Sequence, residues 1–414
     1  MTTRGLLLKT GGPLPAALLL LAGYASAQPP APTFTTLASG LDGPNPLEIG
    51  KGGVLYGSIF DAENPSQAFS LTPPASPGSP WTYTVILGND GFSPVGAFAM
   101  GGGGTLYGVD KTGGSSNCEK GCGLIYSVTP PVSPGGAWTR RTIFPFDDYL
   151  YASGVALGPA GVLYGPGNGS PGSLFSLTPP ASPGSPWTYN QIYTFTGTSD
   201  GTGISVVTIS SEGVLYGTTG QGGLMGVGCL YGCGTVFALA PPESSGGSWT
   251  LTVLHSFESG SGDHYPDIGP SPLALSASGA LYGTLAYGGN TSCTTFPGGC
   301  GSVFVVDPPS SPGGPWGFRT IYSFTGGNDG GNPSGGLVIA SNGDLIGTAS
   351  QAGAAGYGTI FALTPPTSSG GAWTETTLYS FPAGSPGNPG SGVIFGPAGA
   401  LYGVTASTVF SLTR

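Results

Sequence analysis

Six cysteines have the most clearly defined chemistry in this sequence, and they occur as three close pairs: Cys118 and Cys122, Cys229 and Cys233, Cys293 and Cys300. Each pair lies in its own glycine-rich stretch, so adjacency favours three local disulfides over any other pairing. Metal binding through C-x-x-x-C is the alternative, but it needs further ligands and the chain has only two histidines. We therefore expect three disulfide-clipped loops and an oxidising compartment.

Aspartates form a second set, and several of them precede glycine. Asp-Gly pairs make turns in which the carboxylate accepts backbone N–H groups, so a turn role is the first interpretation. If the fold gathers these carboxylates, their oxygens could instead hold Ca²⁺. No D-x-D-x-D-G loop of the EF-hand type is present in the sequence. The set comprises Asp42, Asp90, Asp147 with Asp148, Asp200, Asp263 and Asp329.

Aromatic residues occur in the same segments as these acids. Exposed rings that stack on sugars and carboxylates that bind hydroxyl groups would suit a neutral sugar polymer, whereas packing within the loops is the alternative interpretation. The sequence thus nominates ligand-binding candidates from both residue types: Asp90, Asp147, Asp148, Tyr149, Asp200, Tyr231, Tyr265, Tyr287, Phe296 and Tyr357, with Tyr151 close by.

Support for catalysis is weaker. His264 beside Asp263 could act as a general base, but no Ser or Cys nucleophile accompanies it in the sequence. Asp329 is the third weak catalytic candidate, as one of the carboxylates that could act on a glycoside. Asp147 and Asp148 could also act as a pair, although adjacent residues of an extended chain point to opposite sides. We therefore expect a binding protein, with a hydrolase or lyase acting on a polysaccharide or glycoside as the alternative.

Repeated short strands must position all of these residues. Residues 336–381 contain four runs in which apolar and polar residues alternate, separated by Asn-Gly, Gly-Gly and Pro-Pro, a pattern typical of a four-stranded antiparallel meander. The motif LYG or a close variant marks the second run seven times, and it ends at Gly57, Gly108, Gly165, Gly217, Gly283, Gly347 and Gly403. His255 lies in a fourth run (LHSF) at a position where sister units have tyrosine, as in LYSF at 378–381, so we expect it to be packed.

The repeat is split between the two ends of the chain. The segment 34–39 (FTTLAS) is a fourth run with no unit before it, and the last unit ends after its third run, TVFSLTR. Pairing these two segments would complete seven four-stranded sheets and close a ring without open edges. We predict a single all-β domain over residues 28–414, a seven-bladed β-propeller. A β-solenoid is the alternative, but it gains nothing from a split unit.

The two faces of such a ring differ in sequence. In six units the second proline of Pro-Pro precedes a tryptophan by seven positions, for example Pro180 and Trp187. This constant spacing indicates a structural turn, in which the tryptophan covers the edge of its blade. The connection from LYG to the aromatic residue of the third run instead spans 12, 18, 10, 20, 21, 14 and 7 residues. Because recognition usually uses variable loops on a rigid scaffold, we expect function on that face.

The units also resemble the Gloeo/Verruco (choice-of-anchor) tandem-repeat family of exported bacterial proteins. The motifs that carry the resemblance are LYSF at 378–381, IYSFTGGNDGGNPSGGL at 321–337, and LYGTTGQGG with GCGTVFALAPP between 215 and 242. The resemblance covers nearly the whole chain after residue 27. It implies an exported, repeat-built, propeller-like protein, and it implies no particular chemistry.

Composition and charge limit the partners. Residues 1–27 have the features of a secretory signal: Arg4 and Lys9, an apolar run, and an A-x-A site ending at Ala27. No later stretch is long and apolar enough to span a membrane. The net charge of −10 disfavours nucleic acid. We expect a secreted or periplasmic monomer that binds a glycan or another exported protein, with no membrane insertion and no cofactor other than Ca²⁺.

Overall fold

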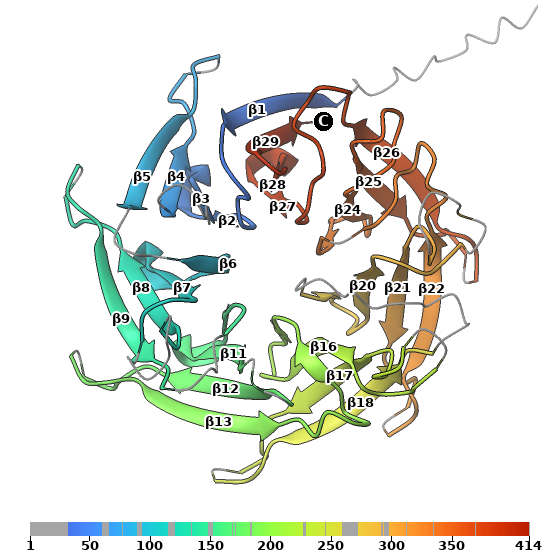
Figure 1. Cartoon of the computed structure of the whole chain (residues 1–414), viewed down its shortest axis with the longest axis horizontal. Coiled ribbons are helices and arrows are strands. Elements are labelled where there is room, and N and C mark those ends of the chain that lie inside the picture. Colours follow the sequence, from blue (N-terminus) through green and yellow to red (C-terminus); the bar gives the residue numbers. More distant parts are fainter. Residues whose placement is uncertain are drawn as a thin grey trace, which may run out of the picture. The chain divides into compact units, whose positions relative to one another are not determined.

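The computed structural model describes residues 32–413 except for 60–65, 77, 89–92, 115–120, 134, 148–151, 168, 170, 183, 227–228, 245, 259–271, 291–292, 294–297, 312, 334 and 369. Within the described residues, the strands form seven antiparallel sheets arranged in a ring (Figure 1). This arrangement confirms the predicted seven-bladed β-propeller.

Each blade has an inner strand a, two middle strands b and c, and an outer strand d. Blade 1 contains β2 (Glu48–Ile49), β3 (Leu55–Ile59), β4 (Gln67–Thr72) and β5 (Thr82–Gly88). Blade 2 contains β6 (Pro94–Met100), β7 (Leu106–Asp110), β8 (Leu124–Thr129) and β9 (Thr139–Pro145). Blade 3 contains β10 (Ala156–Leu157), β11 (Leu163–Gly167), β12 (Ser173–Thr178) and β13 (Thr188–Thr194).

The remaining blades repeat this order. In blade 4, β14 (Thr202–Ile204) and β15 (Thr208–Ile209) both pair with β16 (Leu215–Gln221), which is followed by β17 (Thr235–Ala240) and β18 (Thr250–Ser256). Blade 5 contains β19 (Ala274–Leu275), β20 (Leu281–Leu285), β21 (Ser302–Asp307) and β22 (Gly317–Ser323). Blade 6 contains β23 (Val338–Ile339), β24 (Leu345–Ala349), β25 (Thr359–Thr364) and β26 (Thr374–Ser380). Short 3₁₀ turns join strands a and b in four blades: η1 (Lys51–Gly53), η2 (Gly102–Gly104), η3 (Pro159–Gly161) and η4 (Pro397–Gly399).

Blade 7 closes the ring with strands from both ends of the described chain. It contains β27 (Ile394–Phe395), β28 (Leu401–Val404), β29 (Thr408–Thr413) and, as its outer strand, β1 (Thr33–Ser39). β1 runs antiparallel to β29 with Thr33 opposite Thr413 (Figure 1). The Phe34 ring stacks on Tyr379 of blade 6 at 4.3 Å. The predicted pairing of the terminal segments is therefore confirmed.

The LYG motif exists because an aromatic ring of strand c lies over its glycine. At Gly217 an added Cβ would fall 2.6 Å from the Phe237 ring, and at Gly283 it would fall 2.3 Å from the Phe304 ring. Both phenylalanines are fully buried. Strand c is buried on both sides because neighbouring blades cover its two faces, whereas strand d consists of exposed and half-buried residues.

The phenylalanine that follows strand d joins its own blade to the next one. The Phe257 N–H donates to Gly234 O at 3.1 Å, just before strand c of blade 4, and the Phe257 ring packs edge-on against Phe304 of blade 5 at 5.6 Å. Gly234 has a φ of +87°, which favours glycine. This arrangement explains why SF and GTVF recur together in the sequence.

The tryptophans pack between blades, which differs from the expected position over the edge of their own blade. Trp187 of blade 3 contacts Tyr107 of blade 2 at 5.8 Å, and the same Tyr–Trp contact occurs at six junctions. At the seventh junction both partners are replaced: blade 6 has Ile346 in place of the tyrosine, and Pro32 precedes β1. The predicted structural role is confirmed, but the partner is the neighbouring blade.

Candidate functional site

The loop face of the ring consists of the b–c loops and the connections from strand d to the next strand a, and the two sets of segments are hydrogen-bonded to each other. In blade 4 the Gly223 N–H donates to Thr198 O at 2.7 Å, and in blade 6 the Gly353 N–H donates to Gly327 O at 2.9 Å. Thr198 and Gly327 belong to the connections that precede these blades. The variable loops are therefore fixed to the connections that carry the aspartates.

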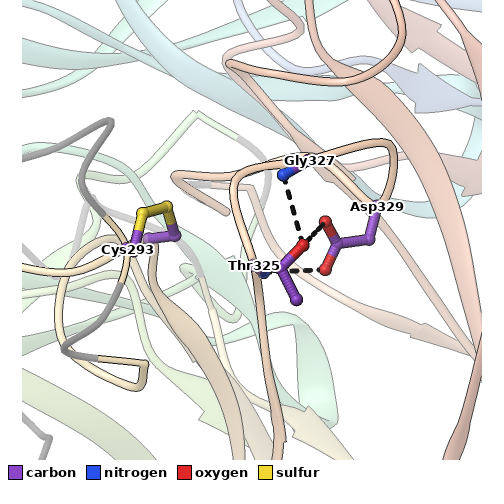
Figure 2. The surroundings of a disulfide bond; sticks show 5 residues. Cys293, Thr325, Gly327 and Asp329 are labelled. Atoms are coloured by element: carbon purple, nitrogen blue, oxygen red, sulfur yellow. Dashed lines mark hydrogen bonds between the residues drawn. A yellow bond between two sulfur atoms is a disulfide. The ribbon is translucent and has the colours of Figure 1, made fainter.

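Asp200 and Asp329 hold two of these connections in the same way. Asp200 accepts hydrogen bonds from the Thr196 N–H at 2.9 Å and the Thr196 hydroxyl at 2.5 Å. Asp329 accepts the corresponding bonds from Thr325 at 2.8 and 2.5 Å, as Figure 2 shows. Both side chains are buried. Their oxygen atoms are thus used within the turn, as the Asp-Gly interpretation predicts.

A tyrosine completes each turn. The Tyr322 hydroxyl donates to Asp329 Oδ2 at 3.0 Å, and Tyr193 makes the same contact with Asp200. Burial raises the pKa of both tyrosines, and the neighbouring carboxylates raise it further. The two phenols therefore stay protonated and act as hydrogen-bond donors. A Ca²⁺ ion or a sugar hydroxyl would have to compete with three donors at each carboxylate.

The predicted disulfides are present wherever the structure describes both cysteines. Cys229 is bonded to Cys233, and Cys293 is bonded to Cys300 (Figure 2 shows the latter beside the Asp329 turn). Cys122 is also disulfide-bonded, while Cys118 lies outside the described residues. The sulfur atoms belong to the core: Cys229 and Cys233 pack in one cluster with blade 5 residues such as Leu273. Each clip therefore anchors its loop against the next blade.

The b–c loop of blade 4 presents exposed apolar side chains. Leu224 is 47% exposed, Met225 and Leu230 are each 79% exposed, and Tyr231 is 76% exposed. Tyr357, in the b–c loop of blade 6, is 37% exposed. Tyr231 and Tyr357 were candidates from the sequence, but the three aliphatic residues were not. Apolar residues inside a glycine-rich loop between cysteines are the feature that could have identified them.

The other candidates from the sequence have varied positions. Asp147 is exposed, and Tyr287, before the Cys293–Cys300 clip, is half-buried. The structure brings neither of them together with Asp200 or Asp329 through a described hydrogen bond. The remaining candidates lie outside the described residues: Asp90, Asp148, Tyr149, Asp263, His264, Tyr265 and Phe296.

Glu48 on β2 is a carboxyl group that the sequence analysis missed. It lies on the innermost strand of blade 1, opposite Tyr56 of β3. No hydrogen bond to its carboxyl occurs within the described part of the chain, and burial raises its pKa to about 7. The corresponding positions of the other blades carry no acid: Ala99, Ala156, Thr208, Ala274, Val338 and Ile394. Since an acid is exceptional at this position, Glu48 is a candidate for chemistry.

Buried Asp110 and half-buried Arg140 form an ion pair in blade 2, which the sequence analysis also missed. Arg140 Nη2 lies 2.6 Å from Asp110 Oδ2, and its guanidinium lies 5.0 Å from the centre of the Tyr126 ring. Asp110 Oδ1 accepts the N–H groups of Ser93 and Thr112, both at 3.0 Å. The pair therefore joins strand d to the start of the b–c loop, which makes it a structural element of the loop face.

His255 is packed against an aromatic ring of the next blade. His255 stacks on Phe318 at 3.7 Å, so the prediction that it is packed is confirmed. Among the described residues, no three His, Cys, Asp or Glu side chains are placed to hold a metal ion. Binding of Ca²⁺ by the aspartates of these connections stays a prediction. No helix within the described ranges has the length and apolar character to cross a membrane.

The fold and its interlocked loop face define the chain as a seven-bladed β-propeller. Among solved structures, a streptogramin B lyase shares 12% sequence identity over 92% of this chain and 97% of its own, with a TM-score of 0.56. Virginiamycin B lyase from Staphylococcus aureus shares 13% over 92% and 99%, also with a TM-score of 0.56. A third match is the extracellular domain of a protein assigned as a hybrid two-component system from B. thetaiotaomicron. It shares 12% sequence identity over 92% of this chain and 39% of its own, with a TM-score of 0.54.

At these identities the similarity concerns the fold alone, because propellers with unrelated activities share one architecture. The lyase activities are those of the named proteins. No family model matches the chain, and no curated protein matches it.

Proposed function

We propose that the chain is an exported bacterial binding or scaffolding module that holds a glycan or another exported protein on its loop face. The observation that carries this proposal is the position of the exposed apolar side chains. Among the described residues seven large apolar side chains are exposed, and five of them lie on the loop face: Leu224, Met225, Leu230, Tyr231 and Tyr357. Clustered exposed apolar groups on a soluble scaffold usually mark a binding surface.

The scaffold supports the same proposal. The two loops that bear these side chains are hydrogen-bonded to connections held by Asp200 and Asp329, and the blade-4 loop is also clipped by the Cys229–Cys233 disulfide. Rigid presentation reduces the entropy lost on binding. The disulfides also support export, since they persist in oxidising compartments. The segment 1–27, with the features of a secretory signal, lies outside the described residues.

A glycan array and a pull-down from cell-wall extracts test this function. The protein with intact disulfides would be compared with Tyr231→Ala and with Val132→Ala, which removes an exposed apolar side chain from the c–d turn of blade 2. We expect saturable binding that Tyr231→Ala weakens about tenfold or more and Val132→Ala leaves unchanged. No saturable partner in either assay would contradict the proposal.

One observation favours a second function, a hydrolase or lyase acting on a polysaccharide or glycoside. Glu48 lies on the innermost strand, and its raised pKa of about 7 would keep a carboxylic acid protonated near neutral pH, as a general acid requires. Asp263 and Asp329 are the sequence candidates for a second carboxylate. Activity screening of the wild type, Glu48→Gln, Asp263→Asn and Asp329→Asn tests this function. A binder would show no turnover in any of them.

A further inference from the structure

We infer that the loop face binds its partner chiefly through one element, the blade-4 knob, and that the partner is a protein with an uncharged apolar groove. The blade-4 knob consists of Leu224, Met225, Leu230 and Tyr231, whose side chains are 47 to 79% exposed. This inference rests on the proposed binding function of the loop face. It goes further because it names the anchor and the chemistry of the partner.

The knob has a fixed backbone before any partner binds. The Gly222 N–H donates to Tyr231 O at 2.7 Å, and the Cys233 N–H donates to Leu224 O at 3.0 Å, so the two sides of the loop are joined at two of the exposed residues. The Cys229–Cys233 disulfide joins the two residues that flank the segment with Leu230 and Tyr231, and both cysteines are buried. The knob therefore projects from a braced support, and a partner would not have to order it.

A fixed shape favours a partner that has a complementary shape. Preorganised side chains lose little entropy on binding, and a few apolar anchors seated in a pocket supply most of the affinity of protein interfaces. A fluid bilayer adapts to any apolar loop, so a braced backbone offers no comparable advantage there. The geometry thus favours a structured protein groove over a lipid surface.

Charge and residue type disfavour the other classes of partner. Residues 213–242, which include the whole knob, contain no charged side chain, and the protein carries a net charge of −10. Anionic lipids and other phosphate-bearing ligands would find no cation at the knob. Three of the four exposed side chains are aliphatic and cannot stack on a sugar ring as an aromatic residue does. Asp200, in the connection that is hydrogen-bonded to this loop, already accepts its own donors.

Site-specific cross-linking tests the inference. A photoreactive diazirine residue would be introduced at position 225 or 230, and at position 132 as the matched control, and the protein would be exposed to the exported fraction of a producing bacterium. The partner protein identified by cross-linking would then be purified and titrated against this protein by calorimetry. The variants for titration are Met225→Ser with Leu230→Ser, Val132→Ser, and Tyr357→Ala, each first checked for unchanged unfolding in urea.

We expect the same protein to be cross-linked from positions 225 and 230 and not from 132. The double variant Met225→Ser with Leu230→Ser should bind this partner about tenfold or more weakly than the wild type does. Val132→Ser should bind it with unchanged affinity. Three results would overturn the inference. The first is no cross-link above that of position 132, and the second is an unchanged affinity of the double variant. The third is that the double variant instead loses binding to phosphatidylcholine vesicles or to a neutral glucan. If Tyr357→Ala abolishes binding and the double variant does not, the loop face binds without the knob, and only this inference fails.

Discussion

The Tyr193 hydroxyl donates a hydrogen bond of 3.1 Å to Asp200 Oδ2 across the turn that leaves strand β13. The same relationship joins Tyr322 and Asp329 two blades later. In both cases the turn also bonds to the b–c loop of the following blade, through Thr198 O or Gly327 O. A carboxylate that looks available for ligands in the sequence therefore supports the loops that present the exposed side chains.

Asp200→Asn should lower the free energy of unfolding by about 1–3 kcal/mol, because the donors from Thr196 and Tyr193 lose a charged acceptor in a buried site. Urea unfolding would measure this change. Asp147→Asn, at an exposed position on the same face, is the control and should behave like wild type. Equal stability of the two variants would show that the turn does not depend on the carboxylate.

Gly217→Ala should destabilise the protein by about 1–3 kcal/mol, because the new methyl group would meet the Phe237 ring at 2.6 Å in a packed core. Thermal unfolding of the purified variant would measure the effect. Gly102→Ala is the matched control, since an added Cβ there meets no atom within 4 Å. A normal melting temperature for Gly217→Ala would mean that strand c can shift to admit the methyl group.

Trp187 and Tyr107 should be energetically coupled across the junction of blades 2 and 3. In a double-mutant cycle with Trp187→Leu and Tyr107→Leu, we expect a coupling energy of about 0.5–1.5 kcal/mol from their edge-on contact. Trp187→Leu combined with Tyr216→Leu, at another junction, should be additive. A coupling energy of zero between Trp187 and Tyr107 would contradict the assigned contact.

Glu48 should make the protein less stable as the pH rises. Its folded pKa of about 7 lies above the ordinary value of 4.5, so the folded state holds the proton more tightly. The stabilisation is complete below pH 4.5 and is lost as the pH rises towards and through 7. Glu48→Gln should remove this loss, which is on the order of 2 kcal/mol after allowance for solvent screening of a half-buried group. Glu212→Gln, at an exposed turn, should keep the wild-type pH dependence of unfolding.

His255 should have the opposite effect in acid. Burial lowers its pKa from 6.5 to about 4, so the unfolded chain takes up the proton first. The stability that the neutral ring contributes is present above pH 6.5 and is lost as the pH falls towards 4. Replacement by the tyrosine found at this position in three other blades, His255→Tyr, should flatten the pH dependence of the unfolding free energy over this range. A variant that retains the acid slope would assign it to other groups.

Local patterns were sufficient to predict the blades. Alternating apolar runs, the LYG motif and the split terminal unit predict strands and ring closure, because each depends on residues that pair with near neighbours or on the two chain ends. The cysteine pairs could be assigned for the same reason: each is closed within a single loop. The structural role of Asp200 was also predictable, since its donors lie within seven residues of it in the chain.

The sequence by itself determined the number of blades, the clipped loops and the regular spacing of the turns. Only the tertiary structure decided which side chains are exposed and which groups meet, because both depend on how one blade packs against the next. Burial gives Glu48 its raised pKa, and the fold pairs Asp110 with Arg140, 30 residues further along the chain. Packing also leaves Leu230 outside the core while the cysteine beside it is buried. Periodicity along the chain carries no information about contacts between blades, so the binding surface could be located only in the folded ring.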